Sequence, residues 1–292
     1  MSLTDTLHHL VERVATTESV DQVGKPVSTA VAKGLGGNRT LKDALSGTWL
    51  GHPLHPMLTD IPIGSWTSAF VLDLVGGERG HQAADMLIGI GILSALPTAA
   101  AGLSDWADTY GEELRIGTVH ALANVTALSL YSLSWLARRR GSRGLGVTLG
   151  FLGATAATAG GYLGGHLVYR KGVGPDRNAW KHGGDDWVVV ADEASIQPGE
   201  PQVVGVGDDE VLLTRAGSEL SAISNVCGHA GGPLSEGSFD DEPGCVTCPW
   251  HGSVFRLADG HLVHGPATGH QPRYEVRTDG GKVSLRRART TV

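Results

Sequence analysis

The sequence predicts an α + β two-domain membrane protein, in which a bundle of four transmembrane helices precedes an all-β domain. Long apolar runs rich in Ala, Gly and Leu occupy residues 54–169, and short Val-rich runs separated by turn signals begin near Trp187. The 292 residues are enough for two domains with separate cores. We place four segments on the chain, with bounds at 1–45, 46–170, 171–186 and 187–292.

The first segment is polar, but its apolar residues are spaced like one face of a short helix. These residues are Leu7, Leu10, Val11 and Val14. Such a helix either lies on the membrane surface or packs on the body of the protein. The segment lacks a basic stretch followed by an apolar stretch, so we expect no secretory signal.

Four apolar runs follow, and each is close to the length of about 20 residues that a bilayer core requires. They cover 56–77, 83–104, 115–137 and 145–169. Four transmembrane helices are the direct interpretation, and a soluble domain of buried helices is the alternative. Overlapping small-xxx-small pairs in the last run suit close helix packing and permit a homodimer. These pairs are formed by Gly160, Gly161, Gly164 and Gly165.

Four histidines and an aspartate are expected near one end of these helices. His52 and His55 precede or begin the first helix, Asp105 ends the second, and His120 and His166 lie about one turn inside the third and fourth. Because helix directions alternate, all five lie in the same leaflet. Such residues are costly in a membrane, which favours a functional role.

Three interpretations of this group stay open. A b-type haem is ligated by two of the histidines, and His120 and His166 lie at matching depths. Alternatively, the group is a quinone or proton site. In the third interpretation the histidines are interfacial and bind helix ends, which suits His52 and His55 because adjacent prolines are typical of a helix entry.

The segment His-Pro-Leu-His-Pro at 52–56, with Asp60 and Pro62 after it, resembles a bacterial family of four-helix membrane domains. The resemblance implies an architecture for residues 46–170 and a multi-pass place in a bacterial cell membrane. It implies no mechanism.

The C-terminal segment shows many short strands, which predict an all-β sandwich or barrel. After the run at Trp187 they are expected at 202–206, 210–215, 220–224, 253–257, 261–263 and 281–286. Pro-Gly and Asp-Gly pairs mark the turns between several of them.

Two Cys and two His stand in matched pairs within this segment. Cys227 and His229 form a Cys-x-His pair, and Cys248 and His251 form a Cys-x-x-His pair. These donors fit a [2Fe-2S] cluster, in which two thiolates bind one iron and two imidazoles the other, or a structural zinc site. The short first spacing, and the absence of a following His-x₃₋₅-His helix, favour the cluster.

The surrounding residues, CGHAGGPL and CPWHGSVF with a later Gly265-Pro266, resemble the Rieske family over about 187–287. The resemblance implies that Cys227 and Cys248 bind a buried iron, while His229 and His251 bind an outer iron near the surface. It also implies electron transfer as the activity.

High-potential Rieske proteins carry a further Cys in each loop, and the two form a disulfide. Gly232 and Trp250 take the corresponding places here, so the resemblance is to ferredoxin-type Rieske domains of lower potential. Cys245 is the remaining cysteine, and we expect a free core residue there. With no disulfide framework, the cluster is expected to face the cytosol. Basic residues do not decide the orientation, because both the third connector and the termini carry them.

The net charge of −7 and the lack of a basic block argue against nucleic-acid binding. We expect a membrane-bound one-electron carrier that passes electrons between a soluble reductase, or another soluble partner, and a haem or quinone in the lipid membrane. The alternative is a redox-sensing or binding module. The sequence identifies no catalytic residue, and because few residues follow the β domain we expect no mononuclear-iron oxygenase domain.

Overall fold

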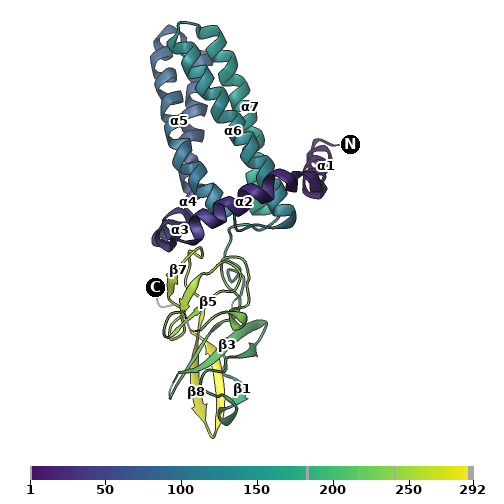
Figure 1. Cartoon of the computed structure of the whole chain (residues 1–292), viewed down its shortest axis with the longest axis vertical. Coiled ribbons are helices and arrows are strands. Elements are labelled where there is room, and N and C mark those ends of the chain that lie inside the picture. Colours follow the sequence, from purple (N-terminus) through teal and green to yellow (C-terminus); the bar gives the residue numbers. More distant parts are fainter. Residues whose placement is uncertain (1, 182–183, 217, 240, 289–292) are drawn as a thin grey trace. The chain divides into compact units, whose positions relative to one another are not determined.

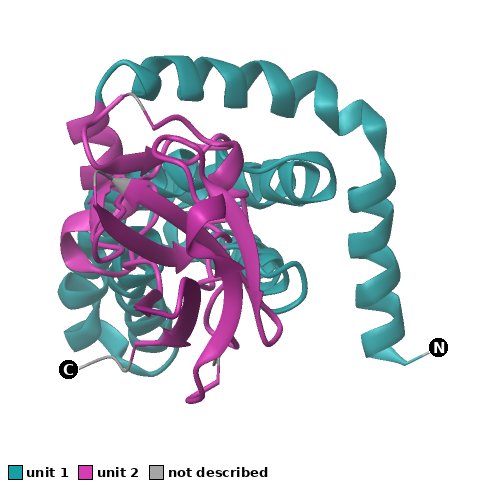
Figure 2. Ribbon diagram, turned by 90° about the horizontal axis from the view of Figure 1, so that it is seen from below, with its two compact units in different colours: residues 1–38, 54–173 teal, residues 39–53, 174–292 magenta. Residues whose placement is uncertain are grey.

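The structure is a computed structural model that describes residues 2–181, 184–216, 218–239 and 241–288. Its chain divides into two compact units. Unit 1 contains residues 1–38 and 54–173, and unit 2 contains residues 39–53 and 174–292 (Figure 2). His182, in the expected connector, lies outside the described residues.

Four long helices form two antiparallel hairpins in unit 1 (Figure 1). They are α4 Leu54–Val75, α5 Gly77–Trp106, α6 Gly111–Arg139 and α7 Arg143–Tyr169. The turn between α4 and α5 requires glycine twice. A Cβ on Gly76 would stand 2.6 Å from the carbonyl oxygen of Leu72, and Gly77 has a φ of 52°. The α4–α5 and α6–α7 hairpins therefore follow directly from runs broken by glycine.

Two of these helices, α5 and α6, are long and apolar enough to cross a membrane, among the described residues. They have 30 and 29 residues. The other two fall short of the same test because of their composition. Asp60, Asp73 and two internal prolines lower the hydropathy of α4, while Gly and Thr are frequent in α7. The helical region is therefore present, but two spans are found where four were expected.

The N-terminal segment forms α1 (Leu3–Thr16) and α2 (Asp21–Gly36), which meet at a sharp angle (Figure 2). Val11 and Ala15 of α1 are buried against Ile116 of α6. The helix expected in this segment thus packs on the body of the unit. On α2, the close approach to α6 uses Gly24, where a Cβ would stand 2.6 Å from a Thr118 oxygen.

Unit 2 is an all-β domain preceded by a short helix, α3 (Arg39–Ser46). One sheet has the antiparallel order β1-β9-β8-β4-β3-β2, and the other has the order β5-β6-β7. The strands are β1 Val188–Asp192, β2 Gln202–Val206, β3 Asp209–Ala216, β4 Glu219–Ser224, β5 Cys245–Thr247, β6 Val254–Arg256, β7 Leu262–His264, β8 Arg273–Asp279 and β9 Lys282–Arg287. The expected strands are present, and β5 and β8 are additional.

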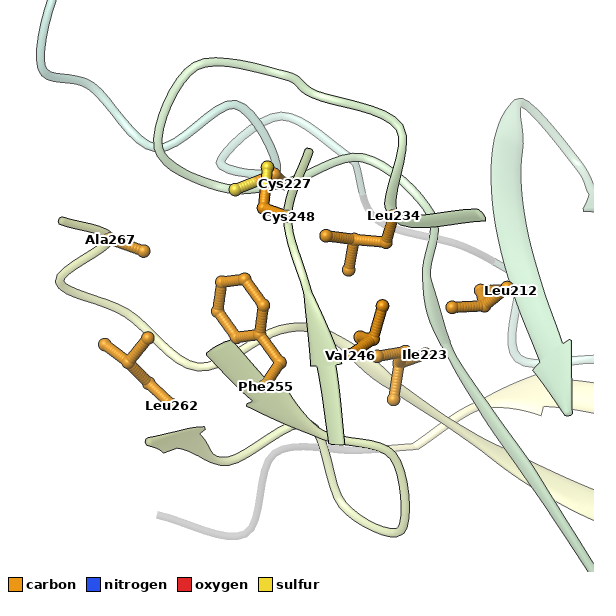
Figure 3. Close-up of a cluster of buried hydrophobic side chains, with 9 residues drawn as sticks. All are labelled: Leu212, Ile223, Cys227, Leu234, Val246, Cys248, Phe255, Leu262 and Ala267. Atoms are coloured by element: carbon orange, nitrogen blue, oxygen red, sulfur yellow. The ribbon is translucent and has the colours of Figure 1, made fainter. Parts of the chain in front are cut away.

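Two apolar clusters fill unit 2. One lies on the six-stranded sheet and includes Val211 and Leu285. The other includes Phe255 and Val246 of the three-stranded sheet together with Leu212 and Ile223 of the larger sheet (Figure 3). Cys227 and Cys248 complete this second cluster. The core that joins the two sheets therefore also supports the two thiols.

Candidate metal centre

Two loops close on the two cysteines in the same way. The first follows β4, where the N–H of Cys227 donates to the oxygen of Gly232 over 2.9 Å and its oxygen accepts from the N–H of Gly231 over 2.8 Å. The second loop lies between β5 and β6. There the N–H of Cys248 donates to the oxygen of Ser253 over 2.8 Å, and the oxygen of Cys248 accepts from the N–H of Gly252 over 3.1 Å. Both loops are therefore held by backbone bonds that need no metal.

The two thiols form one half of the site. Cys227 is 1% exposed and Cys248 is 3% exposed, and their sulfur atoms lie beside each other (Figure 3). The thiols hydrogen-bond, which raises the pKa of Cys227 and lowers the pKa of Cys248. Burial also disfavours the charged form of each. Two buried thiols held this close are suited to a shared cation.

The two imidazoles form the other half. The rings of His229 and His251 have centroids 4.8 Å apart and planes at 90°. Both residues are less buried than the cysteines. Burial first, and then the positive charges of His251, Lys42 and Arg177, lower the pKa of His229 to about 3. The His229 ring is therefore neutral near pH 7, which is the form that binds a metal.

A backbone cradle adjoins the sulfurs. A Cβ on Gly232 would stand 2.9 Å from Sγ of Cys248 and 3.0 Å from Cγ of Trp250. The first loop thus approaches the thiols as closely as a chain without a side chain allows. Among the described residues, no group of three or more Cys, His, Asp or Glu side chains converges on one point. A two-iron cluster does not need one, because each iron takes two protein donors.

The family description "Rieske [2Fe-2S] domain" matches residues 186–275. Ferredoxin CarAc of Metapseudomonas resinovorans is 31% identical over 98 residues, which are 33% of this chain and 90% of that ferredoxin. The chain belongs to the Rieske family. A second family model, described as "Predicted membrane protein (DUF2231)", matches residues 51–177, ahead of the Rieske domain.

Other relatives match about a third of this chain. Apoptosis-inducing factor 3 of Mus musculus is 31% identical over 34% of this chain, which spans 16% of that protein's length. The cytochrome b6-f complex iron-sulfur subunit of Chlorobaculum tepidum is 26% identical over 33% of this chain and 51% of the subunit. Among solved structures, the ferredoxin of carbazole 1,9a-dioxygenase from Nocardioides aromaticivorans is 33% identical, covers 34% of this chain and 96% of its own, and has a TM-score of 0.33.

Asn178, in the expected connector, and Gln271, just ahead of β8, hold the first loop of the Rieske domain. Asn178 Nδ2 donates to the oxygen of Val226 over 2.9 Å, and Gln271 Nε2 donates to the same oxygen over 2.8 Å. Gln271 also accepts from the N–H of Gly228 over 3.1 Å. Asn178 is 4% exposed and Gln271 is 3% exposed. The sequence does not single out these two residues, because neither belongs to a ligand pair.

The helix α3 contributes a second support from another distant segment. Asp43 Oδ1 accepts from the N–H of Gly265 over 2.8 Å, and Asp43 Oδ2 lies 2.9 Å from Nδ1 of His264. Nearby, Thr48 Oγ1 donates to the oxygen of Ala267 over 3.2 Å. These bonds hold the Gly265-Pro266 loop, whose Ala267 belongs to the core around the thiols. Residues ahead of the membrane helices therefore stabilise the Rieske domain.

The structure brings two of the five membrane-region candidates into contact. The rings of His55 and His120 come together, with centroids 6.4 Å apart and planes at 88°. His166 lies in the last turn of α7 and is 8% exposed. Asp105 lies in the last turn of α5, and His52 is exposed and belongs to unit 2. A convergence of all five stays a prediction, and the contact between two of them is the new observation.

Proposed function

We propose that this chain is a membrane-attached, one-electron carrier of the Rieske type. Cys227 and Cys248 hold one iron of a [2Fe-2S] cluster, and His229 and His251 hold the other. The cluster supplies one-electron oxidation and reduction at this site. The observation that carries the proposal is the division of the donors into a buried pair of thiols and a more exposed pair of neutral imidazoles.

The protein residues prepare this site before metal binds. The paired backbone bonds at each cysteine keep the two loops in place, and the core around Phe255 excludes water from the sulfurs. The imidazole side is the side for exchange with a partner, because His229 and His251 are less buried than the cysteines and Trp250 beside them is 52% exposed. A soluble redox partner docks at this face. The named ferredoxin and cytochrome-complex relatives support that role.

The membrane part of the proposal concerns unit 1. Its helices cross a bacterial cell membrane more than once, with the Rieske domain in the cytoplasm, and a haem or quinone in this unit exchanges electrons with the cluster. The family match at residues 51–177 and the two long apolar helices support membrane attachment. On α7, a Cβ on Gly161 would meet no atom within 4 Å, and one on Gly165 would stand 3.9 Å from the Tyr169 ring; a homodimer through this surface stays a prediction.

Spectroscopy of the purified full chain tests the proposal. Before and after dithionite, electron paramagnetic resonance should show a reduced Rieske signal with a low mean g value, which mixed His and Cys ligation produces. His229→Cys should lower the midpoint potential or abolish the signal. An unchanged signal in this variant, or zinc in place of iron, contradicts the ligand assignment.

A transfer assay separates a carrier from a redox sensor. Membranes containing the chain are reduced with NADPH and a soluble reductase, and onward transfer to added quinone, or to an intrinsic haem, is followed optically. A carrier passes its electron on at each turnover. A cluster that is reduced and reoxidised with no onward transfer identifies the sensing alternative.

A further inference from the structure

The two hairpins of unit 1 hold their histidines in the same way. In the α4–α5 hairpin, His55 packs on Gly102, where a Cβ would stand 2.7 Å from Cε1 of the ring. In the α6–α7 hairpin, His120 packs on Gly164, where a Cβ would stand 3.1 Å from Cε1. Each ring thus lies directly against a glycine on the second helix of its own hairpin, where no larger residue would fit. We call Gly102 and Gly164 the seat glycines, and the positions they leave open the seats.

The same relation continues along the bundle. Two further pairs keep the sequence separation of His55 and His120: Trp66 with Tyr131, and Asp73 with Arg138. The aromatic rings stack with centroids 4.2 Å apart, and the charged pair forms a buried ion pair. Glycines again back the rings, at Gly91 and Gly153. The hairpins are therefore an internal repeat, and equivalent residues of the two copies meet where the copies face each other.

Hydrogen bonds determine which nitrogen of each ring carries the proton. Nδ1 of His55 lies 2.9 Å from the oxygen of Thr98, and Nδ1 of His120 lies 2.8 Å from the oxygen of Gly160. Each oxygen belongs to the residue one turn before the seat glycine. A carbonyl oxygen only accepts, so Nδ1 is the donor in both rings. The lone pair is therefore on Nε2, as in a metal-binding histidine oriented by a backbone carbonyl.

The separation of the rings fits one metal ion between them. Because a metal–imidazole bond is about 2 Å long and the nitrogen lies about 1 Å from the ring centre, two imidazoles on opposite sides of one ion have centres about 6 Å apart. The observed separation is 6.4 Å. Two protein donors complete the coordination of an iron that already has four in-plane nitrogens, as in a haem.

We propose that His55 and His120 are the axial ligands of a b-type haem held between the two hairpins. Small residues next to the seats, in the runs 98–102 and 156–161, allow a flat apolar ring to approach α5 and α7. The competing partner is Asn124, whose Nδ2 lies 3.2 Å from Nε2 of His120 and must give way to the iron. This proposal rests on the proposed function, because it identifies the group in the membrane that exchanges electrons with the cluster. The binding of the haem, however, depends on unit 1 alone.

The test uses the full chain, expressed with added iron and 5-aminolaevulinate and purified in detergent. The pyridine haemochrome assay should find about one haem per chain, and the reduced protein should show sharp α-bands. His55→Ala and His120→Ala should each lower the haem content at least tenfold. His166→Ala and His52→Ala are the matched controls, and both should keep the haem.

Two readouts keep the result interpretable if a variant folds poorly. His55→Met should keep the haem with an altered low-spin resonance signal, because methionine replaces one axial imidazole. His120→Gly should regain haem when free imidazole is added. A full chain without haem, retention of haem in both alanine variants, or stoichiometric zinc or copper at the pair overturns the proposal. The Rieske resonance, read on the same samples, reports separately on the proposed function.

Discussion

The two units assemble their candidate sites in opposite ways. In unit 2, each Cys and His pair lies within one short loop, so the local sequence already places the donors. In unit 1, His55 and His120 are far apart along the chain and meet because two similar hairpins face each other. The comparison shows that a site readable as a motif needs distant residues for support, whereas a site built from a repeat is invisible until the fold is known.

The largest expected effect is loss of the cluster, and it should differ between two buried cysteines of unit 2. Cys227→Ser should remove the cluster completely, because the proposed site takes this thiolate as one of four protein ligands. Cys245→Ser is the matched control, since Cys245 is also buried but lies on β5 outside the ligand pairs. Iron content and the Rieske resonance measure both variants. Loss of the cluster in the control, or its survival in the first variant, would refute the assignment.

A buried ion-pair network tests the stability of unit 1. The Arg138 side chain is 0% exposed and bridges Asp73 and Asp85. Arg138→Leu should lower the free energy of unfolding by about 3 kcal/mol, because it removes the buried guanidinium from both carboxylates. The loss is limited because Arg143, 25% exposed, still bridges the same two carboxylates. Thermal unfolding in detergent measures the loss.

The control for this network is the exposed pair of Lys171 and Glu112 in the same unit. Glu112→Gln should cost less than about 1 kcal/mol, because solvent screens the pair. The Rieske resonance of unit 2 should be unchanged in both variants. A collapse of that resonance in Arg138→Leu would show that the two units do not fold independently.

The glycine cradle gives an intermediate effect in unit 2. Gly232→Ala should destabilise the loaded Rieske domain by about 1–3 kcal/mol, because its Cβ would overpack the Cys248 sulfur and the Trp250 ring. Gly205→Ala is the control, since a Cβ there meets no atom within 4 Å. The midpoint temperature at which the visible cluster spectrum disappears measures both. Equal midpoints would show that the first loop has room to move.

The smallest effect concerns the distant support from α3. Asp43→Ala should lower the stability of the Rieske domain by about 1 kcal/mol, because the N–H of Gly265 loses its acceptor. Asp43→Asn keeps an acceptor and should restore most of the loss. Asp192→Ala, whose side chain is 63% exposed beside Lys282, should change stability by less than about 0.5 kcal/mol. If all three variants melt at the same temperature, α3 does not stabilise the site.

Prediction from the sequence worked where chemistry and spacing are local. The alternation of short Val-rich runs with turn pairs predicted most strands of unit 2, although β5 was missed because it has three residues and runs into a ligand loop. Residues 171–186 were expected to be a connector, so the sequence did not single out Asn178, which donates to the oxygen of Val226 in the first loop. A polar residue in a Gly-rich connector carries no periodic signal, so its burial depends on the fold.

In the membrane unit, the sequence predicted helices but not which histidines meet. The sequence favoured His120 with His166 only because the two lie at matching depths. It does not show which of the residues at one depth face each other. Side-chain direction and the repeat of the hairpins instead bring His55 to His120. The local sequence by itself predicted the Rieske domain with its candidate donors and the long helices. The tertiary structure decided the supports and the histidine pair, because these depend on which faces of distant segments pack together.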